Sequence, residues 1–177
     1  MRFACCHCLH CCTDVVCLPT PWDVIRIARE TGQRPKDFLE FLTPDEISEV
    51  AKSDPTWLNC NGDRYIMALC RDKRGCYFLS RKHAKCKIYH ARPILCRLYP
   101  FKLHETRQET LKAFSLHKDV GCPRHQDGVV CTAPLYALYL QDKEHQEDYD
   151  ALVRVFNARR CSKNRPEDFI KLFIQGQ

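Results

Sequence analysis

The chain lacks any long apolar run. No stretch of its 177 residues approaches the roughly 20 consecutive apolar residues that a membrane-spanning helix needs. Its first residues, Met1 to Cys6, contain no apolar segment of the kind that marks a secretory signal. We therefore expect a cytoplasmic protein that works in a reducing compartment and makes no contact with a membrane.

Motifs of several common enzyme classes are missing as well. The sequence contains no G-x-G-x-x-G, no phosphate-binding P-loop and no H-E-x-x-H. It is also short for the barrel that a radical enzyme builds around its cluster. The sequence therefore leaves open whether the protein is an enzyme.

Acidic residues are fewer than basic ones, 22 Asp and Glu against 28 Lys and Arg. The basic residues are scattered, apart from three runs at 71–74, 81–87 and 159–165. Runs of this kind most often form a solvated face of a protein. We therefore do not expect a nucleic-acid partner.

Cysteine, by contrast, is abundant, with 14 residues in the chain. In a reducing compartment, clustered cysteines bind metal more often than they form disulfides. Cys5, Cys8, Cys11 and Cys12 form a C-x-x-C-x-x-C-C run. Thiolates three residues apart can reach one metal ion or one iron–sulfur cluster from a single bend of backbone.

The adjacent pair Cys11-Cys12 restricts how this run can bind. On a helix of about 100° per residue, Cys5, Cys8 and Cys12 share one face, and Cys11 points roughly 100° away from Cys12. The pair could serve two sites, or two irons of one cluster. Alternatively, one of the two thiols only packs as a small hydrophobe.

Three further cysteines, Cys76, Cys86 and Cys96, stand ten residues apart. This wide spacing predicts three elements that fold back so that their ends converge. Pro93 favours a helix start just before Cys96, and the free N–H groups of a helix start suit an anion such as a thiolate-bound cluster. Arg92 and Arg97 could offset the charge of that group or donate N–H···S bonds, or form ordinary surface ion pairs.

Together these features resemble a known family. The opening motif, Cys76, Cys86, the segment from Arg92 to Phe101 and Cys122-Pro123 are similar to the zinc- or iron-chelating domain family named for its CxxCxxCC motif. The resemblance implies eight metal ligands: Cys5, Cys8, Cys11, Cys12, Cys76, Cys86, Cys96 and Cys122. The Cys-rich module of flagellin lysine methylases, for which an iron–sulfur cluster is expected, is distantly similar.

Eight thiolates divide into two sites of four, and each site suits a zinc ion or an iron–sulfur cluster. The overlapping C-x-x-C-x-x-C favours iron–sulfur, as one or two 4Fe–4S clusters, with zinc as the alternative. Cys6 and Cys17 could be spare ligands, but we expect core or surface thiols there and at the four remaining cysteines.

Electron transfer or redox sensing with a partner enzyme is the function that this chemistry favours. Two alternatives stay open: a zinc-stabilised binding module without a redox role, and an accessory or enzyme of protein modification such as methylation. The expected partner is accordingly a redox or a modification enzyme.

The pattern of the chain predicts an α+β fold. We expect a small Cys-rich metal-binding domain of short strands and helices over residues 1–128, followed by a helical extension over 129–177. Helices are predicted from Pro21 to Gly32, over 34–42, and from Thr43 onward. Strands are predicted at 65–69 and 110–116. A long helix should follow Thr132, and the polar stretch 141–150 allows a break in it.

Overall fold

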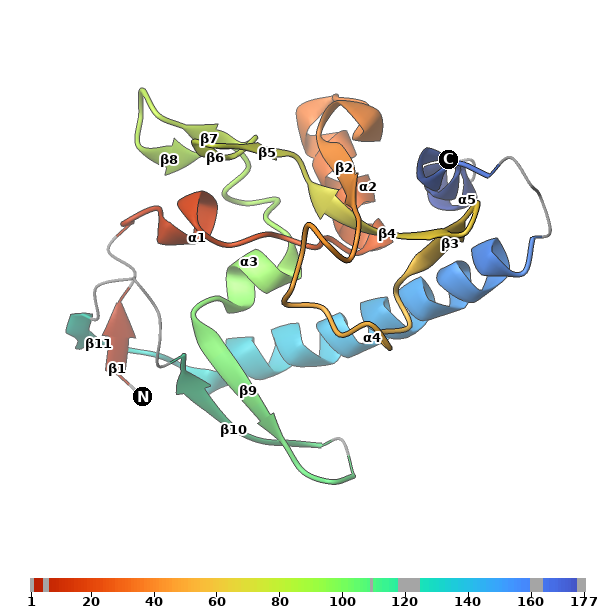
Figure 1. Cartoon of the computed structure of the whole chain (residues 1–177). Coiled ribbons are helices and arrows are strands. Elements are labelled where there is room, and N and C mark those ends of the chain that lie inside the picture. Colours follow the sequence, from red (N-terminus) through yellow and green to blue (C-terminus); the bar gives the residue numbers. More distant parts are fainter. Residues whose placement is uncertain (1, 5–6, 109, 118–124, 160–163, 175–177) are drawn as a thin grey trace.

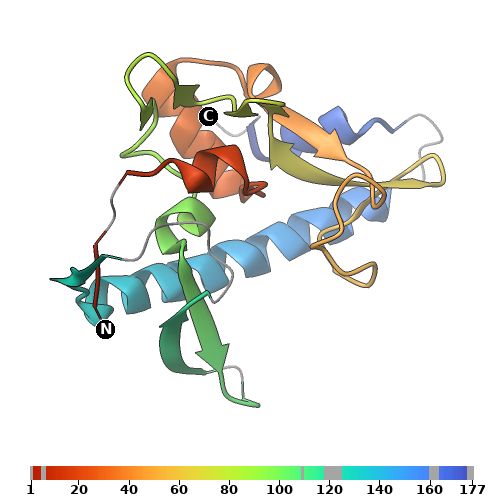
Figure 2. The same cartoon turned by 60° about the vertical axis from the view of Figure 1, so that its left-hand side comes forward.

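The computed structural model describes residues 2–4, 7–108, 110–117, 125–159 and 164–174 of the chain. It confirms the predicted α+β class, because helices and short antiparallel strands alternate before a long C-terminal helix, α4 (Thr132–Asn157). This helix runs along the length of the molecule, and the smaller elements pack beside it (Figure 1, Figure 2).

The strands are short and all precede α4. In chain order they are β1 (Arg2–Ala4), β2 (Leu39–Leu42), β3 (Leu58–Cys60), β4 (Asp63–Leu69), β5 (Arg71–Asp72), β6 (Gly75–Cys76), β7 (Leu79–Ser80), β8 (Lys85–Cys86), β9 (Phe101–Glu105), β10 (Leu111–Leu116) and β11 (His125–Val129). The largest sheet has the order β2–β4–β3. The remaining strands form antiparallel pairs: β1 with β11, β5 with β6, β7 with β8, and β9 with β10.

The helices besides α4 are also short. They are α1 (His10–Thr13), α2 (Pro21–Thr31), the 3-10 turn η1 (Pro35–Asp37), α3 (Ile94–Leu98), the 3-10 turn η2 (Pro166–Ile170) and α5 (Lys171–Ile174). None of the described helices combines the length and the apolar composition that crossing a lipid bilayer requires.

Helix α2 forms where the sequence predicts it. The Thr20 hydroxyl accepts a bond from the Asp23 N–H, and the Asp23 carboxylate accepts one from the Thr20 N–H, which closes a capping box. Gly32 ends the helix with φ +67°, a left-handed conformation that glycine adopts without strain. One face of α2 then buries Val24 and Ile27 in the core.

The predicted helices over 34–42 and after Thr43 are wrong. Only η1 is helical there, and β2 follows it as a strand paired with β4, with Leu39 opposite Leu69. The N–H and the hydroxyl of Thr43 both donate to the Glu46 carboxylate, so only one of the two capping-box bonds is present, and only a turn follows. Strand pairing with the buried β4 outweighs the local helical pattern in this segment, because it also places Leu39 in the core.

The main core lies between the β2–β4–β3 sheet, α2 and the second half of α4. It contains Met67 of β4, Tyr149, Val153 and Phe156 of α4, and Phe169 of η2, all nearly inaccessible to solvent. Phe156 and Phe169 meet edge to face, with ring centroids 5.7 Å apart. Residues far apart in the sequence therefore share one core.

Helix α4 is unbroken through its polar stretch 141–150, so the break that the sequence allows is absent. Within that stretch, His145 and Tyr149 are buried, and the His145 ring lies 5.8 Å from that of Trp22 in α2. Near its start, Leu135 packs against Ile94 and Leu98 of α3. The division of the chain at residue 128 stays a prediction. Helix α4 packs against α3 near its start and joins the main core through its second half.

Candidate metal centre

A small cavity lies where four short elements meet, and thiols dominate its wall. Six cysteines line it: Cys11 and Cys12 of α1, Cys17, Cys76 of β6, Cys86 of β8 and Cys96 of α3. Its volume is about 20 Å³, enough for one small occupant. The three cysteines spaced ten residues apart thus converge, as the spacing predicts, and they meet the C-terminal half of the opening motif.

Helix α1 approaches this cavity through an unusually close backbone contact with Gly75. Gly75 has φ +121°, and a Cβ atom there would lie 2.5 Å from the carbonyl oxygen of Cys12. The Arg71 guanidinium donates to the Thr13 carbonyl at 2.7 Å, and the Leu69 N–H donates to the Cys17 carbonyl at 2.9 Å. Glycine is therefore required in β6 for Cys12 to reach the cavity.

Helix α3, which carries Cys96, is positioned by the buried carboxylate of Asp23. That carboxylate accepts the Ile94 N–H at 3.2 Å and pairs with the Arg26 guanidinium. Arg26 in turn donates to the Arg92 carbonyl at 2.7 Å. The N-terminus of α2 thereby fixes the start of α3, since a buried carboxylate is costly unless its oxygens are bonded.

The thiols interact with one another in two groups. The sulfur atoms of Cys11 and Cys12 are 3.9 Å apart, and Cys12 also forms a hydrogen bond with Cys86. On the other side, the Cys96 thiol donates to the Cys17 sulfur at 3.3 Å. Both residues of the adjacent pair Cys11-Cys12 line this one cavity, and Cys11 also lines a neighbouring one, so the division of the pair between two sites or two irons stays a prediction.

These contacts lower the pKa of some cavity thiols and raise the pKa of others. Hydrogen bonds from Cys12, helped by the positive charge of Arg92, lower the pKa of Cys11 to about 6 and of Cys86 to about 7, although burial opposes both shifts. The same bonds raise the pKa of Cys12. Burial raises the pKa of Cys76 to about 11. Cys11 and Cys86 therefore lose a proton to a metal more readily than Cys12 and Cys76 do.

Of the two arginines expected at the site, Arg92 lines the cavity and Arg97 does not. The Arg92 guanidinium lies 3.9 Å above the centre of the Tyr89 ring, and its Nε donates to the Tyr89 carbonyl at 3.0 Å. Burial, followed by repulsion from Arg26 and Arg92, lowers the pKa of Arg97. Of the two, Arg92 is thus the one placed to offset thiolate charge, and Arg71 of β5 lines the same cavity.

Not all of the predicted ligands can be located at this cavity. Cys8 is exposed and is not part of its lining. Cys5 and Cys122 lie outside the described residues, and their role as ligands stays a prediction. Of the cysteines expected only to pack, Cys60 is buried in the core, whereas Cys131 is exposed.

Sequence reasoning expects only packing from Cys17 on the cavity wall, and it gives Gly75 beside the cavity no special role. Cys17 lies outside the C-x-x-C-x-x-C-C run, yet its buried thiol faces Cys96. Gly75 reads as an ordinary turn residue, and only the fold reveals what its missing side chain allows. The sequence offers only two signals for these residues. Cys17 follows the first cysteine cluster closely, and Gly75 immediately precedes Cys76.

The donor set suits a thiophilic metal. Soft thiolates select zinc and iron–sulfur clusters over hard cations, and apolar groups such as Phe78 and Ile88 complete the wall. Within the described ranges, however, no three His, Cys, Asp or Glu side chains are already grouped as a closed ligand set. The cysteines line one space without converging on one point, so binding requires their side chains to turn inward.

Comparison with known proteins gives one match. A family model, CxxCxxCC, described as "Putative zinc- or iron-chelating domain", matches residues 4–123. The matched segment contains all eight predicted ligands and ends before α4. No curated protein and no solved structure matches the chain.

Proposed function

The chain belongs to the CxxCxxCC family of zinc- or iron-chelating domains, and from this premise we propose that it is an iron–sulfur protein acting in electron transfer or redox sensing. The observation that carries the proposal is the overlapping C-x-x-C-x-x-C run, whose last cysteine, Cys11, lies with Cys12 on the same cavity wall as Cys76, Cys86 and Cys96. Such a run resembles the cysteine runs that bind clusters, whereas structural zinc sites usually pair two separate C-x-x-C units. A 4Fe–4S cluster and a zinc ion each take four thiolates, so the spacing of the cysteines and not their number supports the proposal.

The residues that would hold the group are the cavity cysteines among the predicted ligands: Cys11, Cys12, Cys76, Cys86 and Cys96. Cys17 would be a further ligand or would donate an S–H bond to a ligating sulfur. The predicted ligands Cys5, Cys8 and Cys122 would complete this site or supply a second one. When bound, an iron–sulfur cluster supplies one-electron redox chemistry.

The surrounding residues support this role by their charge and polarity. The pKa values of Cys11 and Cys86 are lowered, and Arg92 on the same cavity wall offsets part of the negative charge of their thiolate forms. Leu69, Phe78 and Ile88 keep that part of the wall apolar, which limits the access of water. Hydrogen bonds, charge and solvent access are the features by which a protein sets the reduction potential of a cluster.

A zinc-stabilised module is the second candidate. The volume of the cavity, about 20 Å³, favours it, because a single ion needs less rearrangement of the wall than a cluster does. In that case the metal would be structural and closed, with no exchange of electrons.

Purification without oxygen distinguishes the two candidates. The iron–sulfur proposal expects a brown protein with bound iron and sulfide and a Mössbauer signature of cluster iron. A colourless protein with stoichiometric zinc contradicts it. Cys76→Ser should remove most of the bound metal, whereas Cys131→Ser, at an exposed position outside the cavity, should leave metal content unchanged.

The proposal includes a protein partner and a cellular compartment. A buried redox group that transfers electrons needs a second redox centre to give or take them. We propose a redox or modification enzyme as that partner, in the cytoplasm, where cysteines remain reduced.

A further inference from the structure

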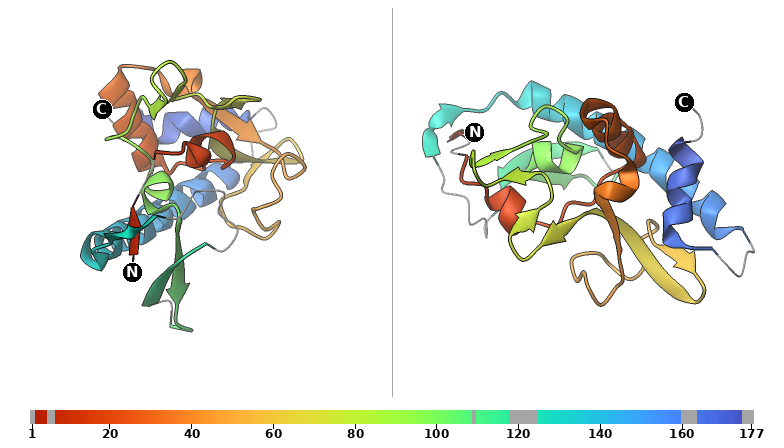
Figure 3. Two further views of the ribbon diagram at one scale, coloured as in Figure 1. Left: turned by 90° about the vertical axis from the view of Figure 1, so that its left-hand side faces the viewer. Right: turned by 90° about the horizontal axis from the view of Figure 1, so that it is seen from above.

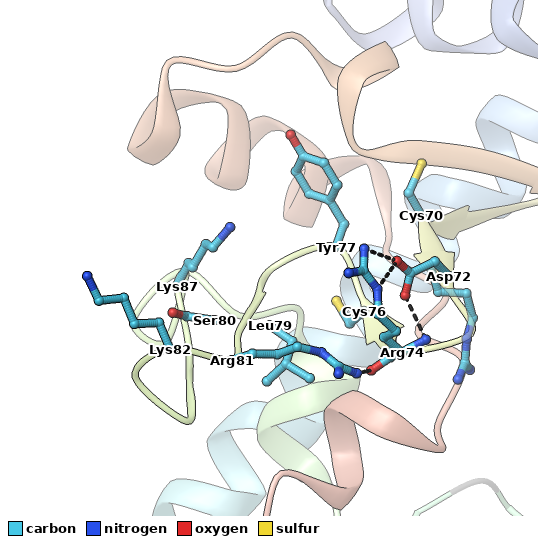
Figure 4. A pocket seen from close by; sticks show the side chains of 12 residues that line it. Cys70, Asp72, Arg74, Cys76, Tyr77, Leu79, Ser80, Arg81, Lys82 and Lys87 are labelled. Atoms are coloured by element: carbon cyan, nitrogen blue, oxygen red, sulfur yellow. Dashed lines mark hydrogen bonds and ion pairs between the residues drawn. The ribbon is translucent and has the colours of Figure 1, made fainter.

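A second and larger cavity lies beside the thiol cavity, on the face formed by β5 to β8 (Figure 4). Its volume is about 490 Å³. One carboxylate, that of Asp72, lines it. Five cationic side chains also line it: Arg71, Arg74, Arg81, Lys82 and Lys87. The charge of this cavity is therefore strongly positive.

The fold assembles this charge from two separate basic runs. The runs at 71–74 and 81–87 each read as a solvated face in the sequence. The β5–β6 and β7–β8 hairpins place them on walls of the same cavity. Figure 4 shows Lys82 and Lys87 on one side and the Asp72–Arg74 pair on the other. Convergence on one concave surface distinguishes these residues from scattered surface charge.

Much of this charge is available to a ligand. Lys82 and Lys87 are exposed, and neither ammonium group makes a hydrogen bond or ion pair with another described residue. Arg81 donates to the Arg74 carbonyl at 2.6 Å, a contact that satisfies one of its donors and leaves its charge unbalanced. Among the described cations of this cavity, only Arg74 is paired with a carboxylate, at 2.8 Å from Asp72. Each guanidinium has five N–H donors, so further donors remain.

The walls indicate which class of anion fits. Pockets for small molecules are mostly apolar and enclose their ligand, whereas here the side chain of Arg74 is 71% exposed. Nucleic acids are bound by phosphate contacts that follow a strand, whereas these cations gather around one hollow. A carboxylate-rich segment of a folded partner matches both the open shape and the local positive charge.

The cationic cavity lies directly beside the thiol cavity. Arg71 and Cys76 line both this cavity and the thiol cavity. A partner segment seated here would therefore lie next to the wall that carries the cysteines. We propose that this cationic cavity docks an acidic segment of the protein partner beside the metal centre. The inference rests on the proposed function in taking that partner to be the one served by the metal.

The test uses the full chain and a fluorescent oligoglutamate peptide as the probe, with binding followed by fluorescence anisotropy. Peptide binding should weaken as salt rises, because exposed charges are screened. Reversing two charges by Lys82→Glu with Lys87→Glu should weaken it by more than about tenfold, since like charges then face the peptide. The double variant Lys102→Glu with Lys112→Glu, on the distant β9–β10 hairpin, makes the same change in net charge and should leave binding unchanged.

Three results would overturn the inference: no binding of the peptide, an equal loss in both double variants, or tighter binding of an oligonucleotide of matched charge. Thermal unfolding of each variant shows whether it is folded. Metal analysis on the same samples separates this inference from the proposed function. Zinc with retained peptide binding refutes only the iron–sulfur proposal, whereas an intact cluster without peptide binding refutes only the docking site.

Discussion

The two ends of the molecule are held together in different ways (Figure 3). At one end, β4 has seven residues, of which four are buried, and it packs against aromatic residues of α4 and η2. At the other end, β5 to β8 have two residues each, and Gly75 is the only one of these eight that is buried. Apolar burial explains the first end, whereas at the thiol end the strands themselves bury little and neighbours such as Phe78 and Ile88 reach the main core.

This difference indicates which end of the molecule a bound metal would stabilise. Isolated two-stranded ribbons are marginally stable in water. The thiol end is held by the Gly75 contact, the Arg71–Thr13 bond and the Asp23 network, together with Phe78 and Ile88, which belong to the main core. Ligands drawn from four elements would add a cross-link at that end, because metal-binding free energy also stabilises the fold that presents the ligands.

The largest effect should come from breaking the apolar end. Phe156→Ala removes a side chain that is 1% exposed and packs against Phe169. We expect the free energy of unfolding to fall by about 4 kcal/mol, as for other large-to-small core changes. Chemical denaturation measures this loss. The metal-to-protein ratio of the folded fraction should stay unchanged, and a parallel loss of metal would contradict the separation of the two ends.

The next effect should come from breaking the thiol end. Gly75→Ala places a Cβ against the Cys12 carbonyl, and we expect a loss of about 3 kcal/mol together with most of the bound metal. Gly62→Ala is the matched control, because Gly62 also has positive φ but a Cβ atom there would meet nothing within 4 Å. The control should lose about 1 kcal/mol and no metal.

Hydrogen exchange locates these two losses. Amides of β4 and the second half of α4 should stay protected in the Gly75→Ala protein, because the apolar end does not depend on this contact. Equal loss of protection throughout the chain would show that the two ends unfold as one unit.

The convergence of the thiols could be predicted from the sequence, and the means of bringing them together could not. The ten-residue spacing of Cys76, Cys86 and Cys96 requires elements that fold back on one another, and the structure brings these three to one cavity. The role of Gly75 depends on which backbone comes close to it, a long-range property that local patterns do not encode. The sequence admits Cys17 as a spare ligand but favours packing there, since Cys96 is its neighbour only in space.

The secondary structure shows the same limit of prediction from local sequence patterns. Helix α2 could be predicted in full because its capping box and its terminal glycine are local signals. Residues 39–42 carry an equally plausible helical pattern, but they pair with residues 66–69 of β4, far along the chain, and that pairing decides their structure. Local signals therefore predict the elements whose partners are local.

A smaller effect should appear at Asp142 of α4, whose carboxyl is partly buried and repelled by Asp23 of α2. Burial, with a lesser contribution from Asp23, raises the pKa of Asp142 to about 6 from 3.8. The folded protein then holds a proton more tightly than the unfolded chain between these values, so stability falls as pH rises through this window. Asp142→Asn should remove that fall and stabilise the protein by about 2 kcal/mol above pH 6, with little change below pH 4.

Chemical denaturation over a pH series measures this effect. Asp45→Asn, at an exposed position, is the control and should keep the pH dependence of the wild type. A steeper fall in the stability of Asp142→Asn as pH rises would contradict the assignment.

The smallest change in stability should come from two serine substitutions, one at each end of the molecule. Each substitution replaces one sulfur atom by an oxygen atom. Cys17 is 8% exposed and faces Cys96 across the thiol cavity, whereas Cys60 is 2% exposed and lies in the apolar core. Cys17→Ser and Cys60→Ser should each cost about 1 kcal/mol, since both bury a hydroxyl in place of a thiol. Only Cys17→Ser should lower metal affinity or alter the absorption of the bound metal, because its sulfur alone adjoins the other cavity thiols. If both variants bind metal as the wild type does, Cys17 only packs, and five cysteines form the described part of the site.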